Sequence, residues 1–466
     1  MPDSVLIISA VSPVPVDNGK RLILHGLLGY FVDRLGPENV HYAFLGSPGE
    51  ARPNFPGIAH RLSRPGSGAQ LLTLVRRFAT DRSCSAQEAL LGSQRLRGEI
   101  QTLVAWLRPT IEIYDTIRIG QHAPSEPRSR RRVLYLDDLF SMRYQTMLDF
   151  ADGGAAISVD PLGEFAVNVP KPLRALIKRP AVYLPVLRME RDRIRRREIQ
   201  MVKEFDTSLL VNPREAKILR SRSGIDRIRA INGLLPAVKR MNRIPSTPPE
   251  LVFLGRLNIP HNDDAICSFL AISMPGLKKL MPGVIVRVIG RGASPRLLRL
   301  AEEYPENVRL EGYVAELESV FAHATAALAP LRFGSGIKIK VLDALARGLP
   351  VIATTAGVDG LPVSFEGGDG CIVDDDFARW PTLLAEIAEA TRNRELSKAA
   401  AAFFERTYAR EVVMAEYDDL FFGDADSGEA REDDSAVDAS WRTQGGGSGS
   451  SARISRTFTQ QEVCDK

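Results

Sequence analysis

One segment, which we call the defining stretch, reads Leu328-Ala-Pro-Leu-Arg-Phe-Gly-Ser-Gly-Ile-Lys-Ile-Lys-Val-Leu-Asp-Ala-Leu-Ala-Arg-Gly-Leu-Pro-Val-Ile-Ala-Thr354. It runs from an apolar segment through a glycine-rich turn and an amphipathic segment to a second apolar run, which predicts a strand, a turn, a helix and the next parallel strand. Glycines at a helix start let the backbone approach an anion closely, and the free N–H groups and the helix dipole stabilise phosphate there. The stretch therefore indicates an α/β domain that binds a phosphorylated ligand.

Three side chains in this stretch strengthen the phosphate hypothesis. Lys338 and Lys340 fall in the first turn of the expected helix, where a cation is unfavourable unless an anion faces it. Asp343 follows two turns into the helix, where its carboxylate could accept two hydrogen bonds from a ribose diol. The alternative interpretation is an ordinary βαβ crossover with a glycine turn, because a lone G-x-G is weak evidence. The two lysines, placed against the dipole, favour the phosphate site.

The same alternation of short apolar runs and longer amphipathic segments is found in both halves of the chain. In the second half we expect strands at 251–254, 284–289, 308–310, 326–329 and 351–353, and helices at 264–272, 295–303, 314–323 and 337–347. In the first half we expect strands at 5–10, 40–45, 110–114, 133–136, 208–211 and 228–231, helices at 20–35, 69–78, 86–107 and 187–205, and an irregular segment at 46–68. The pattern predicts an α/β fold of two Rossmann-like domains that face each other across a cleft.

Composition shifts suggest the domain limits. Residues 237–250 follow Pro236, contain further prolines and show no apolar period, so they are the expected linker between domains 1–236 and 251–402. Residues 403–422 are expected to form a C-terminal helical segment that packs back on the body. From 423 to 466 the chain carries nine acidic and five basic residues and a Gly/Ser-rich run, a composition that predicts a disordered tail.

Bulk composition excludes several classes of protein. The 61 basic and 57 acidic side chains leave a net charge of +4, whereas a dedicated nucleic-acid binder usually has a strong basic excess. The four cysteines lie far apart without any C-x-x-C, which excludes a zinc knuckle or a disulfide framework. No apolar run approaches the roughly 18 residues of a membrane span, and the first apolar run is too short for a signal peptide. We therefore expect a cytoplasmic protein.

One charged segment leaves room for a membrane contact. The expected helix at 187–205 carries a run of arginines beside a narrow apolar stripe. A solvated face on a packed helix is the favoured interpretation of such a run. Contact with anionic lipid headgroups at the inner face of the membrane is the alternative that stays open.

The segment from 328 to 354 resembles the nucleotide-sugar signature of GT-B glycosyltransferases, specifically the fourth, retaining family. Leu342-Asp-Ala-Leu-Ala346 and Gly348-Leu-Pro-Val-Ile-Ala-Thr354 match the family's "LEAMA.G.PVVAT", with Asp343 in place of the second Glu of an E-x₇-E motif. The first Glu of that motif falls at Ser335, as in a subgroup that reads "GGGIKNKVLEAMA". The resemblance implies that Asp343 holds the ribose, and that Lys340 and the amides of residues 334–337 meet the diphosphate and the sugar.

Other motifs follow in the family's order. Phe253-Leu-Gly-Arg-Leu257 resembles "FVGRL", whose Arg, here Arg256, contacts the diphosphate, while His261 stands where the family usually has a Lys. Val288-Ile-Gly-Arg-Gly292 resembles "IVGRG", and Leu310-Glu-Gly-Tyr-Val314 resembles the turn whose backbone meets the base. Near the N-terminus, Ser12-Pro-Val-Pro-Val-Asp-Asn-Gly-Lys-Arg21 resembles a glycine loop near the donor phosphates. The resemblance covers about residues 6–422.

The acceptor side is expected on the first domain. Tyr135-Leu-Asp-Asp-Leu-Phe-Ser-Met-Arg-Tyr144 resembles "HDVDSMRYR" of the acceptor domain and contains Asp137 and Asp138. Because adjacent residues at a strand end point to opposite faces, one of the two is expected to orient an acceptor hydroxyl and the other to cap the next helix.

These features predict a retaining glycosyltransferase that moves a sugar from a nucleoside-diphosphate-sugar to a glycan or lipid-linked acceptor, in surface polysaccharide synthesis. Arg256 and Lys340 are the expected catalytic residues, because positive charge stabilises the departing diphosphate. The expected donor-binding residues are Gly19, Arg21, Gly290, Tyr313, Val314, Gly334, Ser335, Gly336, Ile337, Lys338 and Asp343. No metal and no cofactor are expected, since the resembled family generally needs none. A nucleotide-sugar epimerase on the same fold and a non-catalytic nucleotide-sugar-binding subunit are the two alternatives.

Overall fold

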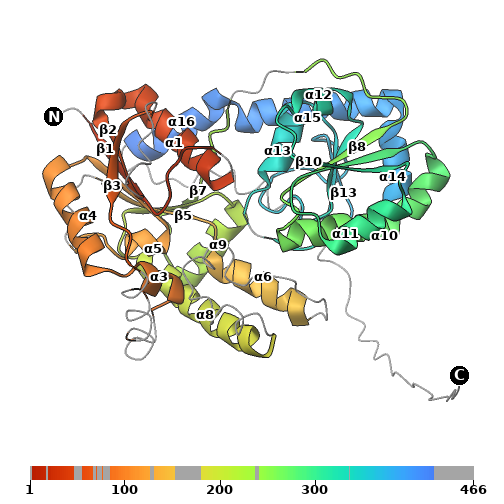
Figure 1. Cartoon of the computed structure of the whole chain (residues 1–466). Coiled ribbons are helices and arrows are strands. Elements are labelled where there is room, and N and C mark those ends of the chain that lie inside the picture. Colours follow the sequence, from red (N-terminus) through yellow and green to blue (C-terminus); the bar gives the residue numbers. More distant parts are fainter. Residues whose placement is uncertain are drawn as a thin grey trace, which may run out of the picture. The chain divides into compact units, whose positions relative to one another are not determined.

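Two parallel β-sheets organise the chain, as the sequence predicts (Figure 1). The computed structural model describes residues 3–16, 19–46, 55–66, 70, 76, 84–125, 131–152, 180–236, 241–334 and 336–423. Met1–Asp424 is one compact unit that contains both sheets. We call the first sheet with its helices the first lobe, and the second sheet with its helices the second lobe. Two segments expected from the sequence lie outside the described residues: the tail at 423–466 beyond its first residue, and most of the helix at 69–78.

The first sheet has seven parallel strands in the order β3-β2-β1-β4-β5-β6-β7. Its strands are β1 (Val5–Ser9), β2 (Val40–Leu45), β3 (Ile58–Leu62), β4 (Ile111–Asp115), β5 (Arg131–Asp137), β6 (Thr207–Leu210) and β7 (Ile228–Ala230). The order reverses direction between β1 and β4. In such sheets the ligand binds beyond the carboxyl ends of the strands at this reversal.

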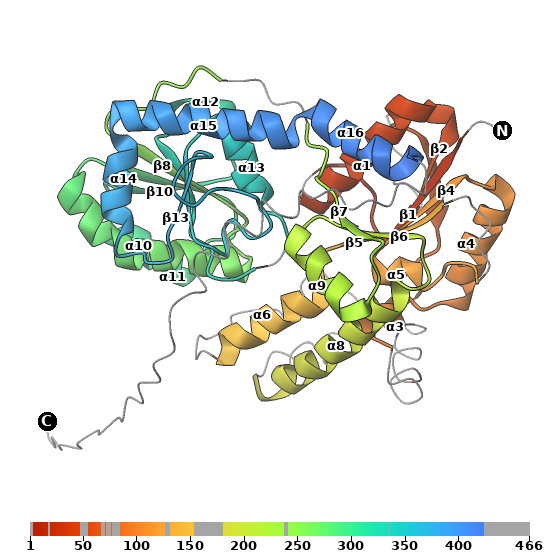
Figure 2. The ribbon, with the colours of Figure 1, turned by 180° about the vertical axis from the view of Figure 1, so that it is seen from behind.

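Helices cover both faces of the first sheet (Figure 2). They are α1 (Gly19–Leu35), α3 (Ala86–Leu91), α4 (Gln94–Leu107), α5 (Thr116–Gly120), α6 (Phe140–Asp152), α8 (Pro180–Met201) and α9 (Pro213–Ser223), with a 3₁₀ turn at Pro37–Asn39. Helices α6 and α8 pack against each other and form a two-helix extension of this lobe.

The second sheet repeats the plan with six parallel strands in the order β10-β9-β8-β11-β12-β13. Its strands are β8 (Glu250–Leu254), β9 (Ile285–Ile289), β10 (Val308–Gly312), β11 (Ala326–Ala329), β12 (Val351–Ala353) and β13 (Cys371–Val373). Its helices are α10 (Pro260–Leu280), α11 (Pro295–Glu303), α12 (Glu318–His323), α13 (Ile339–Ala346), α14 (Trp380–Ala388) and α15 (Ala390–Tyr408). The reversal lies between β8 and β11.

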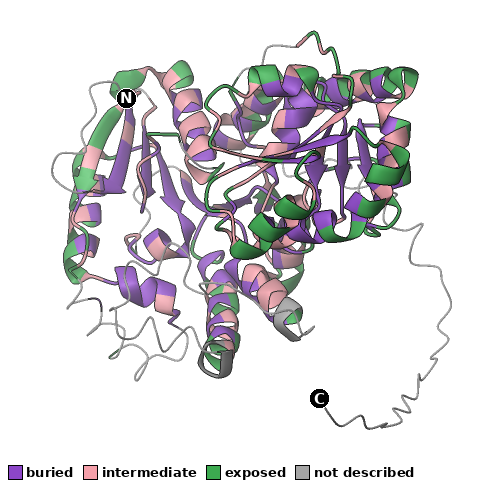
Figure 3. Ribbon diagram, turned by 45° about the vertical axis from the view of Figure 1, so that its right-hand side comes forward, coloured by how far each residue is buried: buried purple, intermediate pink, exposed green. Residues whose placement is uncertain are grey.

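The sheets form the cores of the lobes (Figure 3). Strand β1 is buried along its whole length, which is why its sequence reads as an apolar run rather than as alternation. Strand β4 is buried as well, although two of its five residues are the carboxylates Glu112 and Asp115. Each lobe therefore offers a rigid platform, and the loops at the carboxyl ends of its strands are free to carry functional side chains.

Several element limits differ from the sequence-based expectations. The expected helix at 86–107 is two helices, because Ser85 caps α3 and Ser93 caps α4 with side-chain hydrogen bonds. Helix α10 extends beyond 264–272 on both sides and contains Pro275 within it. Strand β3 lies in a segment that we expected to be irregular, and β13 was not expected at all.

Helix α16 (Arg410–Phe422) follows α15 and runs from the second lobe to the first (Figures 1 and 2). Its Tyr417 hydroxyl donates to the carbonyl of Asn232 at 2.8 Å, and its Asp418 carboxylate accepts from the Tyr30 hydroxyl at 2.7 Å. Aromatic rings of α16 pack edge-on against Tyr30 and Phe31 of α1. The C-terminal segment is thus part of the first lobe's core, although it follows the second lobe in the chain.

In the part of the chain that the structure describes, none of the helices combines the length and the apolar character that crossing a membrane requires.

Candidate functional site

The residues expected to bind the donor follow strands of the second sheet, and several of them lie where that sheet reverses, beyond the ends of β8 and β11. Gly255 and Arg256 follow β8, and Arg256 is exposed there. Gly290 follows β9, and a side chain at this position would meet the carbonyl oxygen of Gly255 at 1.7 Å. The glycine therefore permits the close contact of the two strand ends, which explains the "VIGRG" sequence by packing. The expected contact of Gly290 with the donor stays a prediction.

The glycine turn from the defining stretch connects β11 to α13. Gly334 and Gly336 have φ angles of 144° and 70°, conformations that favour glycine. Ile337 and Lys338 follow, and Lys338 occupies the position just before the first helical residue. Ser335, which we expected to contact the donor, lies outside the described residues.

Lys338 folds back onto its own turn. Its Nζ donates to the carbonyl of Gly336 at 2.6 Å, and the residue is buried. Burial lowers the pKa of this ammonium group, while Asp359, Glu215 and Asp138 oppose that effect. The side chain therefore shapes the turn and faces carboxylates of both lobes, instead of pointing to solvent.

Lys340, which is expected to meet the diphosphate, contacts an amide and an aromatic ring. Its Nζ donates to Asn262 Oδ1 at 3.0 Å and lies 4.7 Å from the centre of the Phe253 ring. Burial, with a smaller contribution from Lys338, lowers the pKa of Lys340 to about 7. An anion placed beside this ammonium group would reverse both effects, because it would supply the missing opposite charge.

Position 261, where the resembled family has a second cation, holds a neutral side chain. The His261 ring packs edge-on against Phe333, and burial followed by repulsion from Lys340 lowers its pKa to about 3. His261 therefore carries no charge near neutral pH. The next residue, Asn262, is the one that contacts Lys340, a role that sequence reasoning missed.

Asp343 lies on α13 and forms an ion pair with Arg347 one turn later. Burial raises the pKa of Asp343, and Arg347 opposes the rise. The Arg347 guanidinium also lies 5.1 Å from the Phe321 ring centre, which fixes its position. The carboxylate is therefore held by a neighbour that the sequence motif did not reveal, and about a third of its side chain remains exposed to a ligand.

Tyr313 and Val314 follow β10, at the place expected for the nucleotide base. Tyr313 is 67% exposed, and the Arg291 guanidinium stacks on its ring at 4.8 Å from the centre. Val314 is half-buried against the core. An exposed aromatic ring held by an arginine offers a flat surface next to the ends of β9 and β10.

The first lobe contributes the start of α1 to the site. A side chain at Gly19 would meet Ile339 Cδ1 of the second lobe at 2.9 Å, so glycine allows the starts of α1 and α13 to approach. Lys20 pairs with Asp115 Oδ1 at 2.8 Å and with Asp137 Oδ2 at 3.3 Å. Arg21 donates to the carbonyl of Pro15 at 3.3 Å.

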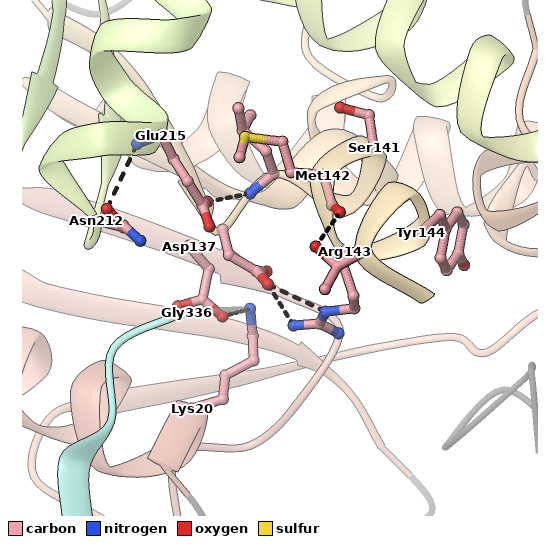
Figure 4. Close-up of polar contacts among 12 residues, drawn as sticks. Lys20, Asp137, Ser141, Met142, Arg143, Tyr144, Asn212, Glu215 and Gly336 are labelled. Atoms are coloured by element: carbon pink, nitrogen blue, oxygen red, sulfur yellow. Dashed lines mark hydrogen bonds and ion pairs between the residues drawn. The ribbon is translucent and has the colours of Figure 1, made fainter. Parts of the chain in front are cut away.

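Figure 4 shows the surroundings of Asp137, one of the two carboxylates expected on the acceptor side. Asp137 has a left-handed φ of 70°, pairs with Lys20 and accepts from the Tyr135 hydroxyl at 3.1 Å. Asp138 is buried and accepts two hydrogen bonds from the Arg143 guanidinium, at 3.1 and 2.5 Å. The expected division of labour, one carboxylate for an acceptor and one for a helix cap, stays a prediction.

A cavity of about 190 Å³ joins these parts. From the first lobe it is lined by Gly19, Lys20, Asp137, Asp138 and Arg143, and from the second by Gly336, Ile337, Ile339 and Leu342, among others. Five of the residues expected from the sequence meet here: Gly19, Asp137, Asp138, Gly336 and Ile337. The expected residues Arg21, Arg256, Gly290, Tyr313, Val314, Gly334, Lys338, Lys340 and Asp343 do not line this cavity.

Sequence reasoning missed Lys20, Asp115, Arg143 and Asn262. Lys20 and Arg143 stand inside the quoted motifs, so their position next to glycine and aspartate was an available signal. Asp115 follows an apolar run at the end of β4, the strand beside the reversal, where a carboxylate is unexpected in a core. Asn262 gives no signal in the sequence, because only folding brings it to Lys340.

Among the described residues, His, Cys, Asp and Glu side chains form no group of three or more that could hold a metal ion.

One family model matches the second lobe. Residues 248–389 match the family model described as "Glycosyl transferases group 1". The matched residues span the second sheet and the expected donor side, so the predicted class of enzyme, a glycosyltransferase, is confirmed there. No curated protein sequence matches the chain significantly.

Solved structures show the same architecture over 90% of the chain. Sucrose-phosphate synthase from Thermosynechococcus elongatus is 14% identical, with a TM-score of 0.60 over 90% of this chain and 98% of that one. S. aureus TarM is 8% identical, with a TM-score of 0.62 over 90% and 99%. Anabaena HepE in complex with UDP-glucose is 11% identical, with a TM-score of 0.54 over 90% and 99%. At such identities the likeness establishes the fold, which is the predicted GT-B arrangement.

Proposed function

We propose that this group 1 glycosyltransferase transfers a sugar from a UDP-sugar to a hydroxyl of a glycan or lipid-linked acceptor, with retention of the anomeric configuration. The observation that carries the proposal is the cavity in which the glycine turn before α13 faces Asp137 and Asp138. The structure of HepE with UDP-glucose, on a similar fold, supports UDP as the nucleotide.

The second lobe supplies what a diphosphate leaving group needs. In the transfer, the acceptor oxygen forms a bond to the anomeric carbon while the bond between that carbon and the β-phosphate oxygen breaks. The electron pair leaves with UDP, and the hydroxyl proton passes to the departing phosphate oxygen on the same face. The amides at the start of α13, together with Lys340 and Arg256, stabilise the growing negative charge.

The first lobe supplies the acceptor side. Asp138 is held rigidly by Arg143 at the cavity wall, and a side chain at Gly336 would lie only 4.0 Å from the Asp138 carboxylate. Asp138 therefore lies close enough to the donor turn to orient a hydroxyl toward the anomeric carbon. Asp137, paired with Lys20, completes the polar wall.

The place of this reaction in the cell is part of the proposal. The exposed arginines of α8, Arg188, Arg195 and Arg196, give the first lobe a basic surface suited to anionic headgroups. We propose a cytoplasmic enzyme with peripheral membrane contact that acts in surface polysaccharide synthesis. A nucleoside-diphosphate-sugar is then the donor, and no metal or cofactor takes part.

A donor-only experiment separates the proposal from its alternatives. Isothermal titration with UDP measures binding, and chromatography of UDP-glucose incubated with the full chain measures turnover. A transferase binds UDP and slowly hydrolyses UDP-glucose to UDP and glucose. Formation of an epimeric UDP-sugar would indicate an epimerase, binding without turnover would indicate a binding subunit, and absence of UDP binding would refute the proposed donor.

A further inference from the structure

The loop between β5 and α6 carries the acceptor-side carboxylates, and its backbone is held in an unfavourable conformation. Asp137 has a φ of 70°, in the left-handed region that non-glycine residues rarely adopt. Such a conformation persists where surrounding contacts fix it, and it is commonly found at functional sites. The contacts that hold this loop are therefore informative.

Two buried glutamates from other helices hold the loop. Glu215 of α9 accepts a hydrogen bond from the Leu139 N–H at 2.6 Å. Glu198 of α8 accepts from the Ser141 N–H at 3.1 Å and from the Ser141 hydroxyl at 2.5 Å. Both side chains are buried, and Figure 4 shows Glu215 above the loop that it contacts.

Burying the carboxyl groups of Glu198 and Glu215 costs folding free energy. Burial raises the pKa of Glu198 to about 7 and that of Glu215 to about 8, although their hydrogen bonds favour the charged form. An apolar side chain of similar volume would avoid this cost but would leave the buried Leu139 and Ser141 amides without an acceptor. Neither glutamate lines the cavity, so neither is placed to contact a substrate there.

We infer that Glu198 and Glu215 are positioning residues, which hold the β5–α6 loop so that Asp138 and Arg143 face the acceptor. The inference rests on the proposed function of the cavity. It deepens that proposal, because two buried carboxylates on separate helices would then position Asp138 and Arg143. We call these two residues the acceptor wall.

Helix α9 also connects this loop with the second lobe. Asn212 caps α9 by accepting from the N–H groups of Arg214 and Glu215. The same Asn212 side chain donates to Asp359 of the second lobe at 3.2 Å, and Arg214 pairs with Asp359 at 3.1 Å. The start of α9 therefore contacts the donor lobe on one side and, through Glu215, the acceptor loop on the other.

Glu190, on the same helix as Glu198, provides a matched control. Glu190 of α8 is buried and accepts from the N–H groups of Ala86 and Gln87 at 2.9 and 3.2 Å. Burial raises its pKa to about 7, as for Glu198. Its hydrogen bonds hold the start of α3 instead of the β5–α6 loop. Loss of Glu190 should therefore cost similar stability without moving the acceptor wall.

Hydrogen exchange of the full-length protein tests the positioning directly. In Glu198→Ala and Glu215→Ala we expect exchange at Leu139 and Ser141 to accelerate by about tenfold or more, since the amides lose their acceptor. Glu198→Gln and Glu215→Gln keep an acceptor oxygen and should restore most of the protection. Glu190→Ala should accelerate exchange at Ala86 and Gln87 and leave the loop unchanged.

Hydrolysis of UDP-glucose, with water as the acceptor, tests the consequence. We expect the two alanine variants to lower kcat about 10- to 100-fold while KM and UDP affinity stay within about twofold, because the donor binds mainly to the other lobe. Ser141→Ala removes one of the two Glu198 contacts and should give a smaller effect, which keeps the test valid if an alanine variant of a glutamate does not fold.

The outcomes are separable. Loop exchange and kcat that stay at wild-type values, or that change equally in Glu190→Ala, would overturn the inference. A wild-type protein that binds no UDP would refute the proposed function, whereas the exchange data would still decide whether the glutamates hold the loop.

Discussion

At the scale of single residues, Lys340 is a buried cation whose described contacts include no carboxylate. Its ammonium group has only the Asn262 oxygen at 3.0 Å and the Phe253 ring face as described partners. Lys340→Met keeps the aliphatic contact with the ring but removes the charge. We expect UDP affinity to fall about 10- to 100-fold, the value of a charge-assisted phosphate contact. Titration calorimetry measures it, and unchanged affinity would show that the diphosphate lies elsewhere.

The pKa of about 7 at Lys340 gives a second prediction. Below pH 7 the free protein already carries the charge, whereas above it the lysine is neutral and must take up a proton to bind the diphosphate. UDP affinity should therefore decrease as pH rises from 7 to 9, by at most about tenfold per pH unit. Calorimetry in buffers of different ionisation enthalpy should detect the proton uptake. In Lys340→Met both the uptake and the pH dependence should disappear.

The next prediction concerns Asp343, whose carboxylate is expected to accept hydrogen bonds from the ribose of the donor. Asp343→Asn keeps the shape but loses the charge, so UDP binding should weaken by about 1–2 kcal/mol. Because Arg347 pairs with this carboxylate, Arg347→Gln is the matched control that breaks the pair and leaves the acceptor in place. Titrations with UDP and 2′-deoxy-UDP give the answer. Equal binding of the two nucleotides by every variant would mean that Asp343 does not contact the ribose.

At the scale of elements, the sequence predicts best where an element is fixed by its own residues. The turn and helix of the defining stretch are recognisable because glycines at 334 and 336 permit the φ angles that the turn requires. Limits fail where distant contacts decide them: Pro275 suggests an end to α10, yet the helix continues because its flanking residues are buried against the lobe. The same holds for the site, since Asn262 and Glu215 become functional candidates only through partners far away in the chain.

Helix α16 offers an element-scale prediction. Phe421 is 3% exposed, and its ring lies 4.9 Å from that of Phe31 and 5.9 Å from that of Tyr417. Phe421→Ala should lower the free energy of unfolding by about 3–5 kcal/mol, because the cavity cannot refill. The neighbouring Phe422 is only half-buried, so Phe422→Ala should cost clearly less. Denaturant unfolding measures both, and equal effects would contradict the packing of α16 on α1.

At the scale of the whole molecule, buried carboxylates in the first lobe couple stability to pH. Burial raises the pKa of Glu215 from 4.5 to about 8, with further contributions from the nearby Asp138 and Asp359 charges. Between these two values the folded protein holds a proton that the unfolded chain has released. The stability contributed by this group is therefore complete below pH 4.5 and is lost progressively as pH rises to 8.

Glu215→Gln removes this contribution, because glutamine stays neutral and keeps an acceptor for the Leu139 N–H, while groups that do not interact with Glu215 titrate alike in both proteins. We expect the free energy of unfolding of the variant, relative to the wild type, to rise with pH between 5 and 8 by at most about 1.4 kcal/mol per unit. Above pH 8 the difference should level off, since both states of the wild type are then ionised. Chemical denaturation at four or five pH values measures it. A difference that does not depend on pH would show that Glu215 is already charged in the folded protein. The free-energy cost that we assign to burying this carboxyl group against the β5–α6 loop would then be absent.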